Sequence, residues 1–150
     1  MKLILAAALL LSSAISNALG RVVSYEEANT NLFGSIQELK KCGHWKRDSQ
    51  LGEFRLIKLY YAGQDMLFVD MIAINENRTQ YNVVFGFSFK EINNDHAEIG
   101  INSLSCEQLE SNNIKITAKA LDGHNNKYFT FELLIDGRKR SYVFRRVPSN

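Results

Sequence analysis

The spacing of hydrophobic residues changes along the chain, from a helical repeat in its first third to strict alternation after Leu51. Ser24 and Glu27 form a capping-box pattern at the start of a helix. Apolar residues then recur at helical spacing, at Ala28, Leu32, Ile36 and Leu39. Lys40 and Lys41 suit a helix C-terminus, where the helix dipole favours positive charge. The pattern therefore predicts one helix over about residues 25–41.

Alternation of polar and apolar residues dominates the remainder, most clearly in the segments YNVVFGFSFK, NIKITAKAL and YFTFELLID. Turn signals such as Gly63-Gln64 and Asp122-Gly123 separate the alternating runs. They predict seven strands, near residues 54–61, 66–74, 81–90, 98–106, 114–121, 127–135 and 140–147, with a short eighth strand near 43–49. Connections this short join antiparallel neighbours. We expect a mainly β (α+β) fold, an N-terminal helix followed by a seven- to eight-stranded antiparallel meander curled into a barrel or half-barrel.

Loop positions also predict which residues share a face of this sheet. A loop centred on Gly63-Gln64 places Ile57 opposite Asp70, with Arg55 diagonal to Asp70 on the same face. A turn centred on Asn77-Arg78 places Asp70 beside Phe85 and Phe68 beside Phe87. The segment 66–74 is apolar on its other face as well, so both faces need cover. The N-terminal helix and the concave interior of the sheet are the natural covers, and a second subunit is the alternative.

Asp70 stands out because a buried carboxylate is costly unless it is paired or hydrogen-bonded. One interpretation is a structural ion pair with Arg55. The other is a polar group inside a ligand cavity, which orients a mostly apolar guest. In the second interpretation the candidate ligand-binding residues are Arg55, Phe68, Asp70, Tyr81, Phe85 and Phe87.

Residues 1–20 have the organisation of a secretory signal peptide. Lys2 precedes an uninterrupted apolar run, and small residues follow at Ser16, Ala18 and Gly20. We expect cleavage after Ala18 or Gly20, and a single domain over residues 21–150. The apolar run is shorter than the roughly 20 residues that a membrane span needs, and a short N-terminal membrane anchor is the alternative.

The stretch KKCGHWKRD raises the question of whether Cys42 is reactive. No motif ties Cys42 to a catalytic base, and two cysteines with three scattered histidines match no zinc-ligand spacing. An exported protein with two cysteines is most simply one with a Cys42–Cys106 disulfide, and two free thiols are the alternative. Trp45 is interpreted as a packing residue that plugs one end of the sheet, or else as an aromatic lip on a ligand pocket. We expect no metal and no cofactor.

Basic residues gather in the C-terminal stretch RKRSYVFRR, whereas the whole chain carries a net charge of only +2. This near balance argues against nucleic acid as a partner. The clustered charges either protect a sheet edge from pairing with other chains or contact an anionic partner, such as a phospholipid surface, a polysaccharide or an acidic protein. The candidate partner-binding residues are Arg138, Arg140, Arg145 and Arg146.

Recognisable catalytic motifs are missing from the sequence, so a non-enzymatic function is favoured. The first hypothesis is an exported binding protein that holds a small apolar or amphipathic ligand on a concave aromatic sheet face. The alternative is a periplasmic or secreted protein-interaction module, an inhibitor or envelope-assembly factor, that acts through loops or the basic C-terminal strand. A third hypothesis is a small enzyme whose site combines Asp70, Arg55 and tyrosines. None of the three involves a helix that spans the membrane.

Overall fold

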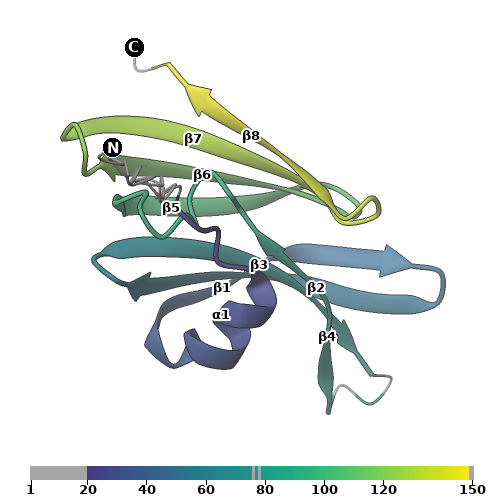
Figure 1. The fold of residues 1–150 in the computed structure, drawn as a ribbon. Helices are drawn as coiled ribbons and strands as arrows, with labels where there is room; N and C mark the ends of the chain where they lie inside the picture. Colours follow the sequence, from purple (N-terminus) through teal and green to yellow (C-terminus); the bar gives the residue numbers. More distant parts are fainter. Residues whose placement is uncertain (1–19, 76, 78, 149–150) are drawn as a thin grey trace, which may run out of the picture.

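The computed structural model describes residues 20–148 apart from residues 76 and 78 (Figure 1). All of the predicted signal peptide except Gly20 lies outside these residues. A short helix and a 3₁₀ turn come first, α1 (Tyr25–Asn31) and η1 (Phe33–Ser35). Eight strands follow, β1 (Ile36–Arg47), β2 (Gln50–Tyr61), β3 (Gln64–Ile74), β4 (Tyr81–Ser88), β5 (Ile99–Glu110), β6 (Asn113–Asp122), β7 (Lys127–Asp136) and β8 (Ser141–Val147).

The strands form two antiparallel sheets, with β1–β2–β3–β4 in sheet 1 and β5–β6–β7–β8 in sheet 2. The two sheets lie in two layers, and α1 covers the side of sheet 1 that faces away from sheet 2 (Figure 1). The predicted class, mainly β with an antiparallel meander after a helix, is confirmed. The meander is nevertheless divided between two sheets and is not closed into a barrel.

The connection between β4 and β5 explains the division. Phe89 and Ile92 in this connection are fully buried, so the chain turns inward instead of continuing along the sheet edge. The Asn93 side chain then occupies the edge of β3 beyond the end of β4. Its Oδ1 accepts a hydrogen bond from Leu67 N at 2.8 Å, and its Nδ2 donates to Leu67 O at 2.6 Å. The amide thus takes the place of a further residue of β4, and the chain crosses to the other layer.

The helix is shorter than predicted. Ser24 does cap it, because Ser24 Oγ accepts a hydrogen bond from Glu27 N at 3.1 Å. The helix ends at Asn31, however, and from Ile36 onward the chain pairs with β2. A long hydrogen-bonded ladder outweighs a helical pattern that Gly34 and several asparagines already weaken. The eighth strand expected near residues 43–49 is therefore the end of a longer β1.

Two hydrophobic clusters result, and β3 is buried on both faces. The main core lies between the sheets and includes Phe54, Leu56, Val69, Ile116 and Phe131. The second core lies between α1 and sheet 1 and is made of Val23, Tyr25, Ala28, Ile57, Leu59, Met66 and Phe68. Sheet 2 and α1 are therefore the two covers that the doubly apolar strand requires.

Candidate functional site

The register of sheet 1 separates the predicted ligand-binding residues into three groups. Arg55 lies directly opposite Asp70 across β2 and β3, whereas the sequence placed it diagonally. The cause is the β2–β3 turn, which consists of Ala62 and Gly63 and shifts the pairing by two residues. A shift of two keeps every side chain on its face, so Arg55, Phe68 and Asp70 do share one face, the face that carries α1.

Phe85 and Phe87 lie on the opposite face. Val83 pairs with Ile72 as predicted, but the register shifts after this pair because β4 contains one extra residue, Val84. Beyond this β-bulge Phe85 pairs with Met71, so its side chain points into the interior between the sheets. The grouping of Phe85 and Phe87 with Asp70 was therefore wrong. Tyr81, near the start of β4, remains 52% exposed.

Asp70 is completely buried and fully engaged. The Arg55 guanidinium donates from Nε to Oδ1 at 2.9 Å and from Nη2 to Oδ2, and the Tyr25 hydroxyl donates to Oδ2 at 2.9 Å. Burial and the nearby carboxylate raise the pKa of the Tyr25 phenol, and the hydrogen bond to Asp70 raises the pKa of Arg55. A carboxylate that accepts three hydrogen bonds and has no exposed surface cannot contact a substrate. The cluster therefore has a structural role, because it joins α1 to strands β2 and β3.

The sequence analysis missed Tyr25 as the third member of this cluster. Its ring lies over Gly86, where an added Cβ would come within 2.0 Å of Tyr25 Cγ. A glycine on an otherwise bulky strand can mark such a close approach, and this was the signal available in the sequence.

The interior aromatic residues pack against one another. Phe87 is 3% exposed and contacts Phe85 edge to face, with ring centroids 4.8 Å apart. On sheet 2, Phe131 stacks with Phe144 at 5.4 Å. The predicted concave aromatic face is therefore the lining of a packed core, and an open surface for a ligand must be sought elsewhere.

A groove of about 900 Å³ lies on the face of sheet 1 that carries α1, at the end that the helix leaves uncovered. Its walls come from β1, the β1–β2 turn, β2, the end of β3 and the start of β4. Most of its lining residues are polar, with Leu51, Ile74 and Tyr81 as exposed or half-buried apolar contacts. The full lining consists of Lys41, His44, Trp45, Ser49, Gln50, Leu51, Gly52, Glu53, Ile74, Asn75 and Tyr81.

The floor of this groove holds a buried carboxylate. The residue Glu53 is 7% exposed, whereas the Lys41 side chain that reaches it is 67% exposed. Lys41 Nζ donates a hydrogen bond to Glu53 Oε1 at 2.9 Å and lies 2.8 Å from Oε2 without hydrogen-bond geometry. Among the described residues, Glu53 Oε2 accepts no hydrogen bond. The hydrogen bond to Glu53 raises the pKa of Lys41, so the ammonium stays charged at neutral pH.

Trp45 fixes the position of Glu53. Its ring is 2% exposed and lies against Gly52, where an added Cβ would be 2.2 Å from the indole. The indole Nε1 donates a hydrogen bond to Glu53 O at 3.2 Å. Trp45 is therefore a packing residue at one end of the sandwich, and it also lines the groove.

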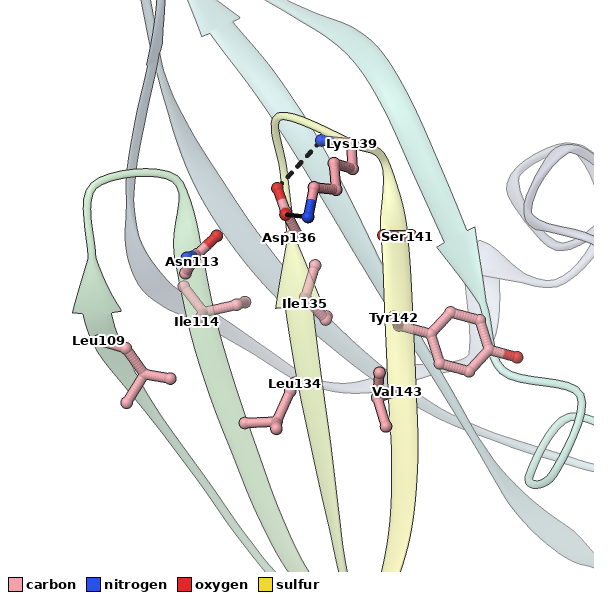
Figure 2. Close-up of a pocket in the computed structure, with 10 residues that line it drawn as sticks. All are labelled: Leu109, Asn113, Ile114, Leu134, Ile135, Asp136, Lys139, Ser141, Tyr142 and Val143. Atoms are coloured by element: carbon pink, nitrogen blue, oxygen red, sulfur yellow. Dashed lines mark hydrogen bonds and ion pairs between the residues drawn. The ribbon is translucent and has the colours of Figure 1, made fainter.

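A second, shallower hollow of about 300 Å³ lies on the outer face of sheet 2 (Figure 2). Leu109, Leu134 and Val143 come from three strands and meet there, and Leu109 and Val143 are each 50% exposed. The turn beside it is held by Asp136, whose Oδ1 accepts hydrogen bonds from the backbone N–H groups of Arg138 and Lys139. These bonds lower the pKa of Asp136.

The four candidate partner-binding arginines all lie on the β7–β8 hairpin. Arg140 lies over the Phe85 ring at 5.2 Å, and Arg146 lies over the Phe129 ring at 4.2 Å. Arg145 pairs across the ladder with Glu132. Within the described part of the chain, none of the four forms an ion pair, and the acidic residue of the turn, Asp136, binds Lys139.

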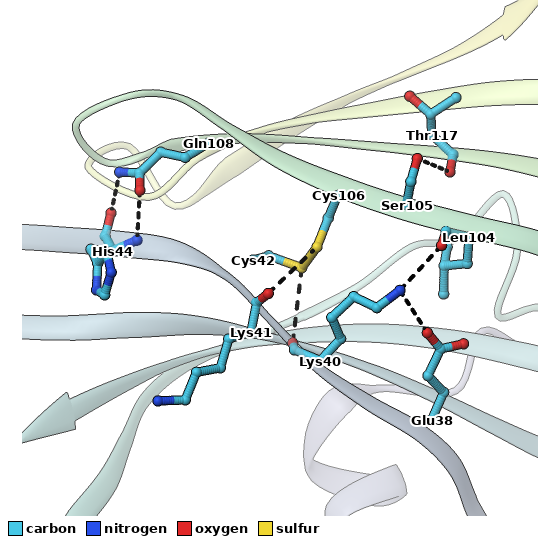
Figure 3. The surroundings of a disulfide bond; sticks show 10 residues. All are labelled: Glu38, Lys40, Lys41, Cys42, His44, Leu104, Ser105, Cys106, Gln108 and Thr117. Carbon is cyan, nitrogen blue, oxygen red and sulfur yellow. Dashed lines mark hydrogen bonds and ion pairs between the residues drawn. A yellow bond between two sulfur atoms is a disulfide. The ribbon is translucent and has the colours of Figure 1, made fainter.

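The predicted Cys42–Cys106 disulfide is confirmed, and it joins the two sheets through β1 and β5 (Figure 3). Beside it, the Gln108 side chain closes the same edge. Its Oε1 accepts from His44 N at 3.0 Å, and its Nε2 donates to His44 O at 2.9 Å. Cys42 is therefore an anchor between the layers, not a reactive centre.

Across residues 20–148, without 76 and 78, no group of three or more His, Cys, Asp or Glu side chains is arranged to hold a metal ion. Within the same described part of the chain, no helix has the length and apolar character needed to cross a membrane. Comparisons with family models, curated proteins and solved structures gave no significant match.

Proposed function

We propose that this protein is an exported, non-enzymatic binding protein that holds a small amphipathic ligand in the groove of sheet 1. The observation that carries the proposal is the Lys41–Glu53 pair on the groove floor, where Glu53 Oε2 accepts no hydrogen bond from the described residues although Lys41 Nζ lies 2.8 Å away. Buried acceptors are normally hydrogen-bonded, so a ligand donor that moves in beside Lys41 completes the bonding of this carboxylate.

The rest of the lining defines the ligand's other features. Leu51 and Tyr81 are more than half exposed, and with Ile74 they offer an apolar wall to the body of a ligand. The Lys41–Glu53 pair is neutral as a unit and presents both a donor and an acceptor. These properties suit a small molecule with an apolar body and a hydroxyl or ammonium group at one end. The predicted aromatic face is not the site, because its phenylalanines fill the core.

Export is part of the proposal. The signal-peptide pattern of residues 1–20 motivates it, and the disulfide supports it because such bonds persist in oxidising compartments.

The test is native mass spectrometry of the protein purified gently from the exported fraction of its native host. We expect an added mass that is lost on denaturation, and its identification gives the ligand. Leu51→Asp should remove this mass because it places a charge on the apolar wall. Leu109→Asp is the matched control, since Leu109 is similarly exposed on the other sheet, and this variant should keep the mass. The proposal is refuted if the wild-type protein carries no added mass, or if Leu51→Asp retains the added mass.

A further inference from the structure

The outer edge of strand β8 is uncovered. It pairs with β7 on one side, and beyond its other side no element of the described chain lies in Figure 1. The edges of β1 and β5 are tied together by the disulfide and by Gln108. On sheet 1, Tyr25 of α1 packs on the face of β4 over Gly86. An uncovered strand edge offers a row of backbone donors and acceptors to an added strand.

Side chains on both faces of β8 suit a particular kind of added strand. Val143 and Arg145 point to the outer face, where Val143 continues into the apolar hollow with Leu109 and Leu134. Phe144 and Arg146 point to the inner face, and Phe144 is half-buried. On each face of β8, an apolar side chain is therefore followed along the strand by a basic side chain.

The arginines are positioned and available. Arg140 and Arg146 rest on aromatic rings, which hold their guanidinium planes in place while leaving their N–H groups unpaired with any acidic group of the described chain. A positioned guanidinium binds a carboxylate through two parallel hydrogen bonds. Charges that serve only to repel other strands need no such support.

From this charge and shape complementarity we propose that β8 is a docking edge for an extended segment of another protein, in which two adjacent apolar residues adjoin two adjacent acidic residues. The segment adds as a ninth strand beside β8, its carboxylates bind Arg145 and Arg146, and its apolar side chains enter the hollow around Val143. This surface is separate from the groove of sheet 1, so it stands or falls independently of the ligand proposed there.

The test uses a library of random peptides displayed on phage, selected against the oxidised full-length protein. We expect enriched sequences in which a pair of adjacent Asp or Glu residues adjoins a pair of apolar residues. A synthetic enriched peptide should bind about tenfold or more weakly to Arg145→Glu/Arg146→Glu, because like charges then face each other. Binding should also weaken steeply with added salt. Lys46→Glu/Arg47→Glu, a matched reversal of two exposed charges on β1, should bind as the wild type does.

Hydrogen exchange decides whether the peptide adds as a strand. Bound peptide should slow exchange of the backbone amides of β8 and leave those of β4 unchanged. Enriched peptides that bind both double variants equally, or that leave the β8 amides unprotected, overturn the proposal. A further outcome is that no peptide is enriched and that the variant Arg145→Val/Arg146→Val self-associates in sedimentation. The arginines would then only protect the edge from pairing, and the docking proposal would be overturned.

Discussion

Arg55 on β2 lies directly opposite Asp70 on β3, and its guanidinium holds a carboxylate that has no exposed surface. The Arg55 side chain itself is 29% exposed, so the pair extends from the core of sheet 1 toward solvent. Tyr25 completes the cluster from α1. This arrangement adds a buried charge to the apolar contacts that dock the helix.

Replacing that charge should destabilise the protein. In Asp70→Asn the amide keeps the shape but leaves the Arg55 cation without its partner, and breaking a buried pair in this way costs about 3–5 kcal/mol. We expect a loss near the lower end, because Arg55 is partly solvated. Urea unfolding followed by Trp45 fluorescence measures it. Asp48→Asn, in an exposed turn, is the control and should change stability by less than about 0.5 kcal/mol. Equal stability of the two variants would show that the pair is not structural.

Gly86 should resist even a single added carbon. A Cβ at this position would lie 2.0 Å from Tyr25 Cγ, so Gly86→Ala must displace the ring and loosen α1. Overpacking of this kind costs about 1–3 kcal/mol. Gly100→Ala is the matched control on β5, since its Cβ would meet nothing within 4 Å. Calorimetry should show a lower midpoint for Gly86→Ala and little change for Gly100→Ala, and the reverse order would contradict the placement of Tyr25.

Tyr25 should also make stability depend on alkaline pH. Its pKa is raised in the folded state, by burial first and by Asp70 second, above the ordinary value of about 10. Its contribution is therefore fully present below about pH 10 and is lost as the pH rises toward the folded pKa. Above about pH 10 the wild type should lose stability more steeply with rising pH than Tyr25→Phe does. Tyr60→Phe, at a half-exposed position, should retain the wild-type slope, and parallel slopes for wild type and Tyr25→Phe would rule the effect out.

Removing the disulfide should cost more than any surface change. The cysteines are 64 residues apart in sequence, and closing a loop of that length stabilises a fold by about 4 kcal/mol through loop-closure entropy. Cys42→Ala/Cys106→Ala should lose about this much in urea unfolding at neutral pH. The wild type under strong reductant is a second measurement of the same loss. A double variant as stable as the oxidised protein would mean that the remaining contacts between β1 and β5 suffice.

The bulge at Val84 in β4 marks the limit of what the alternating pattern could predict. The pairing of Val83 with Ile72 follows from loop length and was predicted correctly. One extra residue in β4 then moves Phe85 to the opposite face, and nothing in an alternating sequence distinguishes Val84 from its neighbours. The proposed aromatic ligand face depended on this one residue. The two-residue error at the β2–β3 turn was harmless in comparison, because the faces were preserved.

The groove was missed for a different reason. Lys41, Glu53 and Tyr81 are far apart in sequence, and a helix was expected where β1 begins. Ile36 and Leu39 fit a helical repeat but are 37% and 55% exposed in the strand, so apolar spacing alone was misleading there. The disulfide could be predicted because it depends on compartment and cysteine count, not on register.

Each layer of the sandwich is assembled from one continuous half of the chain, residues 36–88 for one and 99–147 for the other. Every strand pairs with a neighbour in sequence, and such local contacts form early in folding. Cys42 and Cys106 belong to different halves, and their Cα atoms come within 5.4 Å only when the layers meet. The rate at which the Cys42–Cys106 disulfide forms during refolding therefore reports when the two halves meet. This rate can be measured separately from the rate at which the strands form.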